Sequence, residues 1–312
     1  MNFVSKTTLA KRCISQTASV LGVVGLSAIA TLGVVESASA ESFPGIGDDN
    51  FESIFDAELE ILVGPLAGTK FQVNNLLDPS QVVARSSPFV DGGIGVDDIG
   101  YFDLSPDSGL PTQIKDSDFP AIPDGFNGTF QETIHLQITS LNAVSPDGQF
   151  RLLAGKPLQD EFPEFFQPSL GMVVSDGSTG FPARSFFVPY TLIATPFGNL
   201  IANHKQYANP IIADKPLTQL PPIGITYETN SPDFLVCANN LDGLPVATFR
   251  DLRHHVSDVS TSPPLSPPDL SNLGSICPSR SSTSVPEPSG AMGLLALGFL
   301  GRFYILKQQN KA

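Results

Sequence analysis

The residues best suited to bind a metal ion are three aspartates in a glycine-rich stretch. The sequence VDGGIGVDDIG brings together Asp91, Asp97 and Asp98. Carboxylate oxygens are the ligands that Ca²⁺ prefers, but the stretch lacks the alternating ligand positions and the closing glutamate of an EF-hand loop. Glycine-rich turns between strands also contain such aspartates, so calcium is a candidate cofactor beside an ordinary turn.

Acidic residues suited to hydrolysis occur in the stretch LQDEFPEFF, which contains Asp160, Glu161 and Glu164. Glycosidases need two carboxyl groups at a fixed separation in a cleft, and an acidic loop has the same appearance in a sequence. Residues 41–312 contain no G-x-S-x-G stretch of the kind that carries a serine nucleophile. The sequence therefore predicts no catalytic residue.

The four histidines are also unpromising as metal ligands. His135 lies on the polar side of an alternating stretch, where we expect an exposed side chain. His254 and His255 are adjacent, and neighbouring side chains of an extended chain point to opposite sides. They cannot easily bind one metal ion together.

The charge of the chain excludes one class of partner. Residues 41–287 contain 11 basic and 30 acidic residues, a net charge of −19. Binding to a phosphate backbone requires clustered lysine and arginine, so no nucleic acid is expected as a partner.

The N-terminus has the three parts of a secretory signal peptide. A basic start is followed by an apolar run over residues 18–35 and by small residues at Ala38 and Ala40. We expect residues 1–40 to be a signal peptide that is cleaved after Ala40, and an uncleaved membrane helix is the alternative. Export leaves Cys237 and Cys277 in an oxidising compartment, where we expect them to form a disulfide.

The central region is rich in strand patterns. Residues 57–63 alternate between apolar and polar, and so do residues 129–141, in which Ile134, Leu136 and Ile138 share a side. Turn clusters such as SPDG and SDGSTG separate these runs, and GDDNFESIFDAELE is the best candidate for a helix. Many short strands without helical alternation predict a mainly β fold, an antiparallel β-sandwich-like domain over residues 41–250.

The end of the chain differs from this domain. Residues 251–284 are rich in Ser, Thr and Pro, which is typical of a flexible linker. In the tail, residues 285–312, an apolar run over 290–306 measures about 25 Å as a helix, the short limit for a membrane span. Arg302, Lys307 and Lys311 would hold its end on the cytoplasmic side. We therefore expect a C-terminal transmembrane helix.

The tail also resembles a known family of signals. Val285, Pro286, Glu287 and Pro288, then the run GAMGLLALGFLG, then basic residues, resemble the PEP-CTERM sorting signal of exported bacterial proteins. The resemblance covers only the tail, with the signal peptide that this family requires. It implies that Pro286, Glu287 and Pro288 are recognised by an exosortase, an integral-membrane enzyme that cleaves the signal. It also implies release to the cell exterior, often in bacteria that build extracellular polymer.

These observations together predict an exported, non-enzymatic surface or extracellular-matrix protein. It would first be anchored in the inner membrane and then reach the cell surface or the medium. The expected partners are the export machinery, the exosortase, the membrane before processing, and extracellular polysaccharide. The alternatives are a secreted polysaccharide-acting hydrolase and a carbohydrate- or calcium-binding module.

Overall fold

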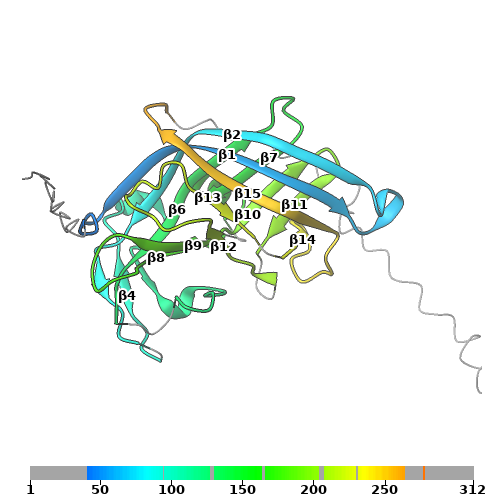
Figure 1. Ribbon diagram of the computed structural model, residues 1–312. Coiled ribbons are helices and arrows are strands. Elements are labelled where there is room, and N and C mark those ends of the chain that lie inside the picture. The colour runs from blue at the N-terminus through cyan, green and yellow to red at the C-terminus, as the bar shows by residue number, and fades with distance from the viewer. Residues whose placement is uncertain are drawn as a thin grey trace, which may run out of the picture. The chain divides into compact units, whose positions relative to one another are not determined.

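Four long antiparallel strands form the backbone of the fold. The computed structural model describes residues 41–263, apart from 94, 127–129, 164–165, 204–206 and 230, together with Cys277. The long strands are β15 (Ala247–Val259), β1 (Gly47–Ile61), β2 (Lys70–Arg85) and β6 (Glu132–Val144), hydrogen-bonded in that order. They run side by side across the molecule (Figure 1).

Two sets of shorter strands connect β6 back to β15. One set follows the C-terminal half of β6 in the order β7 (Arg151–Gly155), β10 (Thr191–Thr195), β11 (Gly198–Ala202) and β14 (Asp233–Cys237). The other follows its N-terminal half in the order β8 (Ser169–Ser175), β9 (Ala183–Val188), β12 (Ile211–Ala213) and β13 (Thr226–Glu228). Because β14 and β13 both pair with β15, the pairings close into two rings that share the four long strands.

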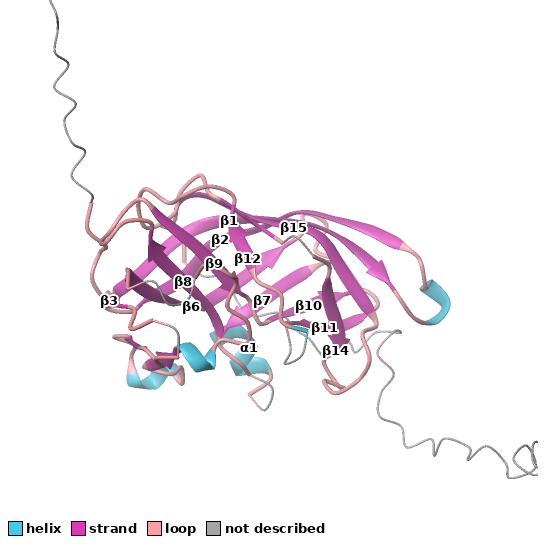
Figure 2. Ribbon diagram, turned by 60° about the horizontal axis from the view of Figure 1, so that its bottom comes forward, coloured by secondary structure: helices cyan, strands magenta, loops and turns pink. Residues whose placement is uncertain are grey.

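The remaining elements are short. β3 (Phe89–Val90) completes the 13-stranded sheet by pairing with β6, and β4 (Ile99–Tyr101) pairs with β5 (Gln113–Lys115) in a separate small sheet. The helical segments are η1 (Gly64–Leu66), η2 (Pro106–Ser108), η3 (Asp116–Asp118) and α1 (Lys156–Glu161). Figure 2 shows the helical segments at the margins of the strands. Within the described residues, no helix has the length and apolar character needed to cross a membrane.

Alternation of side chains explains why the long strands form. Along β1, every second residue from Asp49 to Ile61 is buried and the residues between them are more exposed. The pairing registers of β1 shift near Ser53 and Ala57 on both sides. Such irregularities bend a strand, which allows the sheet to curve round and close.

The main core lies between the long strands and the shorter sets, and Phe55, Leu59, Ile138, Tyr227 and Phe249 are among its members. A second core lies on the other side of β8 and β9, where side chains from the β4–β5 region and the loop that follows it pack. Its members include Phe102, Ile114, Phe119, Phe126, Met172 and Phe186. The chain has 22 Phe and no Trp, so phenylalanine supplies most of the aromatic contacts in both cores.

The mainly β, antiparallel prediction is confirmed, and two details differ. All described strands except β4 and β5 belong to one large sheet that closes on itself, instead of to two stacked sheets. The domain also does not end at residue 250, because β15 continues to Val259. Leu252, His254 and Val256 are buried in alternation, so residues 251–259 belong to the sheet and not to the linker. The helix candidate GDDNFESIFDAELE is part of β1.

Candidate functional site

An open groove of about 470 Å³ is the largest feature that could accept a ligand among the cavities we describe. It lies between three parts of the chain: β5 with η3, the segment just before β8, and the residues Tyr190 and Asn203, which follow β9 and β11. Its lining consists of Pro111, Gln113, Ile114, Asp118, Pro120, Gln167, Pro168, Tyr190 and Asn203. Pockets for small organic molecules usually measure 300–1,000 Å³, so the size is appropriate for such a ligand.

A buried histidine holds one wall of the groove in place. His135 on β6 is fully buried, with Nδ1 3.1 Å from the carbonyl oxygen of Ile114 and Nε2 2.8 Å from Oδ1 of Asp116. Gly100 packs against the ring so closely that a Cβ atom there would lie 2.6 Å from Nδ1. The prediction that His135 is exposed is wrong, because the small β4–β5 sheet covers this side of β6.

Asn203 and Tyr190 form the rear wall. Asn203 has a left-handed backbone (φ 58°), its Nδ2 donates to the carbonyl of Pro189 at 2.8 Å, and its Oδ1 accepts from the Asn209 backbone at 2.6 Å. Burial raises the pKa of Tyr190, so its hydroxyl stays neutral. Both the nitrogen and the oxygen of the Asn203 side-chain amide are engaged, which fixes this wall.

A small buried cavity lies on the other side of Asn203. Its volume is about 20 Å³, enough for a single water molecule. Asp233 lines it, is only 1% exposed, and has no hydrogen-bond partner of good geometry for either carboxylate oxygen among the described residues. Burial raises the pKa of Asp233 to about 7, and the nearby Asn209 side chain opposes this shift in part. Burial, followed by the charge of His255, lowers the pKa of His254 in the same lining to about 3.

A serine–histidine pair beside this cavity has a structural role. Oγ of Ser53 donates to Oε1 of Gln81 at 2.6 Å and lies 2.9 Å from Nε2 of His254. The His254 ring also stacks on Phe55, with the ring centroids 4.3 Å apart. Because Ser53 and His254 are both buried in the core, a substrate cannot reach this pair. No local pattern could have predicted this pair, since the two residues are 201 positions apart.

The three candidate calcium ligands are each engaged in hydrogen bonds to the backbone or side chains of nearby loops. Oδ1 of Asp91 accepts from the backbone of Gly93, Oδ2 of Asp98 from that of Gly92, and Asp97 accepts from the backbone and hydroxyl of Ser117. These carboxylates stabilise the loop. Among the described residues, no three His, Cys, Asp or Glu side chains come together in a way that could hold a metal ion.

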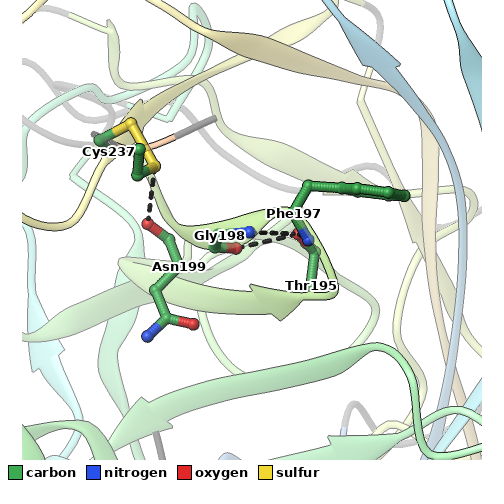
Figure 3. The surroundings of a disulfide bond; sticks show 6 residues. Thr195, Phe197, Gly198, Asn199 and Cys237 are labelled. Atoms are coloured by element: carbon green, nitrogen blue, oxygen red, sulfur yellow. Dashed lines mark hydrogen bonds between the residues drawn. A yellow bond between two sulfur atoms is a disulfide. The ribbon is translucent and has the colours of Figure 1, made fainter. Parts of the chain in front are cut away.

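The predicted disulfide is present (Figure 3). Cys237 at the end of β14 and Cys277 have Cα atoms 5.4 Å apart, and Sγ of Cys277 lies 3.5 Å from the carbonyl oxygen of Asn199. The bond therefore fixes one point of the chain beyond β15 to the edge of the domain.

The other predicted sites lie outside the described residues. They are Ala38 and Ala40 at the signal cleavage site, Val285, Pro286, Glu287 and Pro288, and the flanking Arg302, Lys307 and Lys311. The predicted membrane helix over residues 290–306 also lies there.

Of the acidic stretch LQDEFPEFF, Asp160 forms an ion pair with Lys156 at 2.5 Å on the surface of α1.

Comparison with protein families identifies the tail. Residues 284–308 match the family model described as the PEP-CTERM protein-sorting motif. The chain carries a PEP-CTERM sorting motif. The motif implies export through a sorting system, and it covers the tail alone.

Two other comparisons add little. No curated protein matches the sequence. Among solved structures, the chain is similar to DynF from the dynemicin biosynthesis pathway of Micromonospora chersina, with a TM-score of 0.45 and 12% identity. The match covers 72% of this chain and 88% of DynF.

Proposed function

We propose that this chain is an exported, non-enzymatic surface or extracellular-matrix protein whose tail is recognised and cleaved by an exosortase. The match of residues 284–308 to the PEP-CTERM motif carries this proposal. The protein passes through the inner membrane, is anchored there by the apolar run over 290–306, and is then transferred to the cell surface or the medium.

The chemistry of the described residues favours a role without catalysis. Glycoside hydrolysis needs two carboxyl groups that face one another across a substrate. Asp118 is the one carboxylate among the described residues that line the groove. The Ser53–His254 pair has no access for a substrate. A secreted hydrolase is therefore the less favoured alternative.

The proposal is tested by changing the motif and following the protein in a host that contains an exosortase. The double variant Glu287→Ala/Pro288→Ala should stay in the membrane fraction at its unprocessed mass, while the unchanged protein loses its tail. The matched control is Pro268→Ala/Asp269→Ala, which makes the same kinds of substitution before the motif and should be processed normally. If neither protein loses its tail, the tail is only an anchor, and if the motif variant loses its tail as readily as the unchanged protein, Glu287 and Pro288 are not the recognition element.

The groove favours a second candidate function, the binding of a neutral saccharide. Its described lining has the amides of Gln113 and Gln167, the carboxylate of Asp118 and the rings of three prolines, and no lysine or arginine. Amides and carboxylates bind sugar hydroxyls, and proline rings can pack on the apolar faces of a sugar. An anionic polymer would find no positive charge there.

Titration with neutral and with acidic oligosaccharides, followed by NMR or calorimetry, tests this candidate. The neutral ligand should bind, and Gln113→Ala/Gln167→Ala should weaken its binding at least tenfold, which corresponds to about 1.4 kcal/mol. Gln159→Ala is the control, because this glutamine lies nearby and donates to the carbonyl of Gly109 outside the lining. Binding of the acidic ligand alone, or unchanged binding by the double variant, would refute the assignment.

A further inference from the structure

One end of the domain presents an apolar surface to solvent. The hairpin between β1 and β2 turns through Leu62, Val63, Gly64, Pro65, Leu66, Ala67 and Gly68, none of which is charged. Leu62 and Val63 are 39% and 38% exposed, although leucine and valine side chains are usually buried. We call residues 62–68 together with Leu244 the apolar tip.

Leu244 belongs to the same surface although it comes from another loop. The backbone N–H of Leu62 donates to the carbonyl of Val246 at 2.9 Å, which ties the hairpin to the loop between β14 and β15. Leu244 in that loop is 82% exposed. Figure 1 shows the β1–β2 hairpin projecting past the start of β15 at this end of the sheet. Two separate loops therefore present apolar side chains at one end.

The charges next to the tip are largely compensated. Lys70 at the start of β2 pairs with Glu58 at 2.6 Å, and Arg250 on β15 pairs with Glu60 at 2.7 Å. Asp242 is the exposed acidic residue in the loop that carries Leu244. In a domain with a strongly negative charge, an uncharged projection with paired charges at its base is suited to an apolar or interfacial environment.

Cys277, the last described residue before the tail, lies near this same end. Cys237 ends β14, and its disulfide partner Cys277 lies against the carbonyl of Asn199 beside the β10–β11 turn. Phe197 in that turn packs on Phe71 of β2, with the ring centroids 4.6 Å apart, and Phe71 pairs with Leu59 near the base of the hairpin. The anchor point of the tail is therefore a close neighbour of the apolar tip.

The length of the remaining chain limits how far the domain can stand from a membrane. Pro286 follows Cys277 by nine residues, a span of at most about 30 Å, and Gly290 follows it by thirteen, at most about 45 Å. Without the disulfide the tether would be counted from near Ser260, and its maximum reach would be about two to three times as long. Because the tether is short, contact between the tip and the membrane that holds the tail is an intramolecular event at high effective concentration.

We propose that the apolar tip contacts the surface of the lipid bilayer in which the tail is inserted, and so orients the domain on the membrane before the tail is cleaved. This inference rests on the proposed function, because it requires the tail to be in a membrane. We assign lipid as the partner of this surface for two reasons. The tip is uncharged and lies near Cys277, where the tail begins. The tether between Cys277 and the membrane segment is also too short to let the domain move far from the bilayer.

The absence of tryptophan from the chain allows a direct test. The full exported chain, residues 41–312 with the disulfide intact, is reconstituted into phosphatidylethanolamine–phosphatidylglycerol vesicles, with and without bromine-labelled acyl chains. Val63→Trp and Leu244→Trp each place a single tryptophan in the tip. The control is Val90→Trp. Val90 is 62% exposed and comes shortly after the end of β2, where Arg85 pairs with Gly47. This end of the β1–β2 ladder is opposite to the tip.

The two tip variants should show a blue shift of their emission on vesicles and quenching by the brominated lipid, and Val90→Trp should show neither. If the chain floats with the vesicles and the tip tryptophans are not quenched, the inference is wrong and the proposed anchoring stands. If the chain does not float with the vesicles, both are wrong. A blue shift that grows with protein concentration without vesicles would assign the tip to a second copy of the chain and would also overturn the inference.

Discussion

Nε2 of His254 lies 2.9 Å from Oγ of Ser53, and this contact joins the last long strand of the sheet to the first. Ser53 continues the connection to Gln81 on β2, so three neighbouring strands share one buried polar chain. Buried polar groups with partners define which strands are neighbours, because an alternative register would leave them without partners.

Removing the central hydroxyl should therefore destabilise the fold. Ser53→Ala leaves the side chains of His254 and Gln81 without this buried partner, which should lower the free energy of unfolding by about 1–3 kcal/mol. Urea denaturation of both proteins measures the change. Ser257→Ala is the control, since the Ser257 hydroxyl connects the same two strands at the margin, by donating to the carbonyl of Glu52 at 3.2 Å. A loss in the control as large as in Ser53→Ala would argue against a special role for the buried chain.

Asp233 should make the protein less stable as the pH rises from about 4 to about 7. Its pKa is raised to about 7 in the folded protein from an ordinary value of 3.8, so the folded state holds the proton more tightly than the unfolded state. The stability that the folded protein gains from binding this proton more tightly is fully present below about pH 4, and it is lost as the pH rises to about 7. His254 acts in the opposite sense: its pKa is lowered to about 3 from 6.5, so its contribution is complete above pH 6.5 and is lost as the pH falls to about 3.

Asp233→Asn should consequently stabilise the protein at pH 8, by an amount on the order of 2–4 kcal/mol, and have little effect at pH 4. Asparagine resembles the protonated acid and cannot ionise. Thermal unfolding at the two pH values measures the difference. The exposed Asp107→Asn serves as the control and should change neither value. If Asp233→Asn gives the same change at both pH values, ionisation of Asp233 is not the cause.

The amino-acid pattern predicts the class of this fold better than it predicts the boundaries of its strands and of the domain. Alternation of apolar and polar residues identifies the strands at residues 57–63 and 129–141, because one side of each strand faces a core. The stretch from Gly47 to Glu60 is the best helix candidate in the sequence, yet Phe51, Ser53 and Phe55 face inward with a period of two. Similarly, the Ser, Thr and Pro content of residues 251–284 predicts a linker, but in residues 251–259 only every second residue needs to be apolar for a strand that closes a sheet.

The sites show a comparable division. The cysteine pair and the sorting motif were predictable because each depends on few residues and on the compartment. The groove was not, since it requires β5 and η3 to fold back over β6, and nothing near His135 in the sequence indicates that cover. The aspartates from 91 to 98 were ambiguous because loop hydrogen bonds and calcium ligation use the same residue types.

The His135 contacts predict how the groove can be loosened. His135→Ala removes the hydrogen-bonding contacts to Ile114 and Asp116 and leaves a cavity beside Phe89 and Phe119, so it should cost about 2–4 kcal/mol of stability. Amide hydrogen exchange should increase more at residues 113–118 than in β10 or β11. The comparison is His255→Ala, which removes a partly buried histidine that contacts Thr226. A uniform increase in exchange over the whole domain would contradict local anchoring.

The disulfide should stabilise the domain chiefly by restricting the unfolded chain. Its cysteines are 40 residues apart, so Cys237→Ser/Cys277→Ser should lower the free energy of unfolding by about 3–4 kcal/mol. Because both cysteines are buried, the two serine hydroxyls that replace their sulfur atoms should lower the free energy of unfolding further. Guanidinium denaturation with and without reductant separates these effects. Reductant should lower the midpoint of the unchanged protein and leave that of the double variant where it is. A midpoint of the unchanged protein that reductant does not move at equilibrium would show that the cross-link contributes nothing to stability.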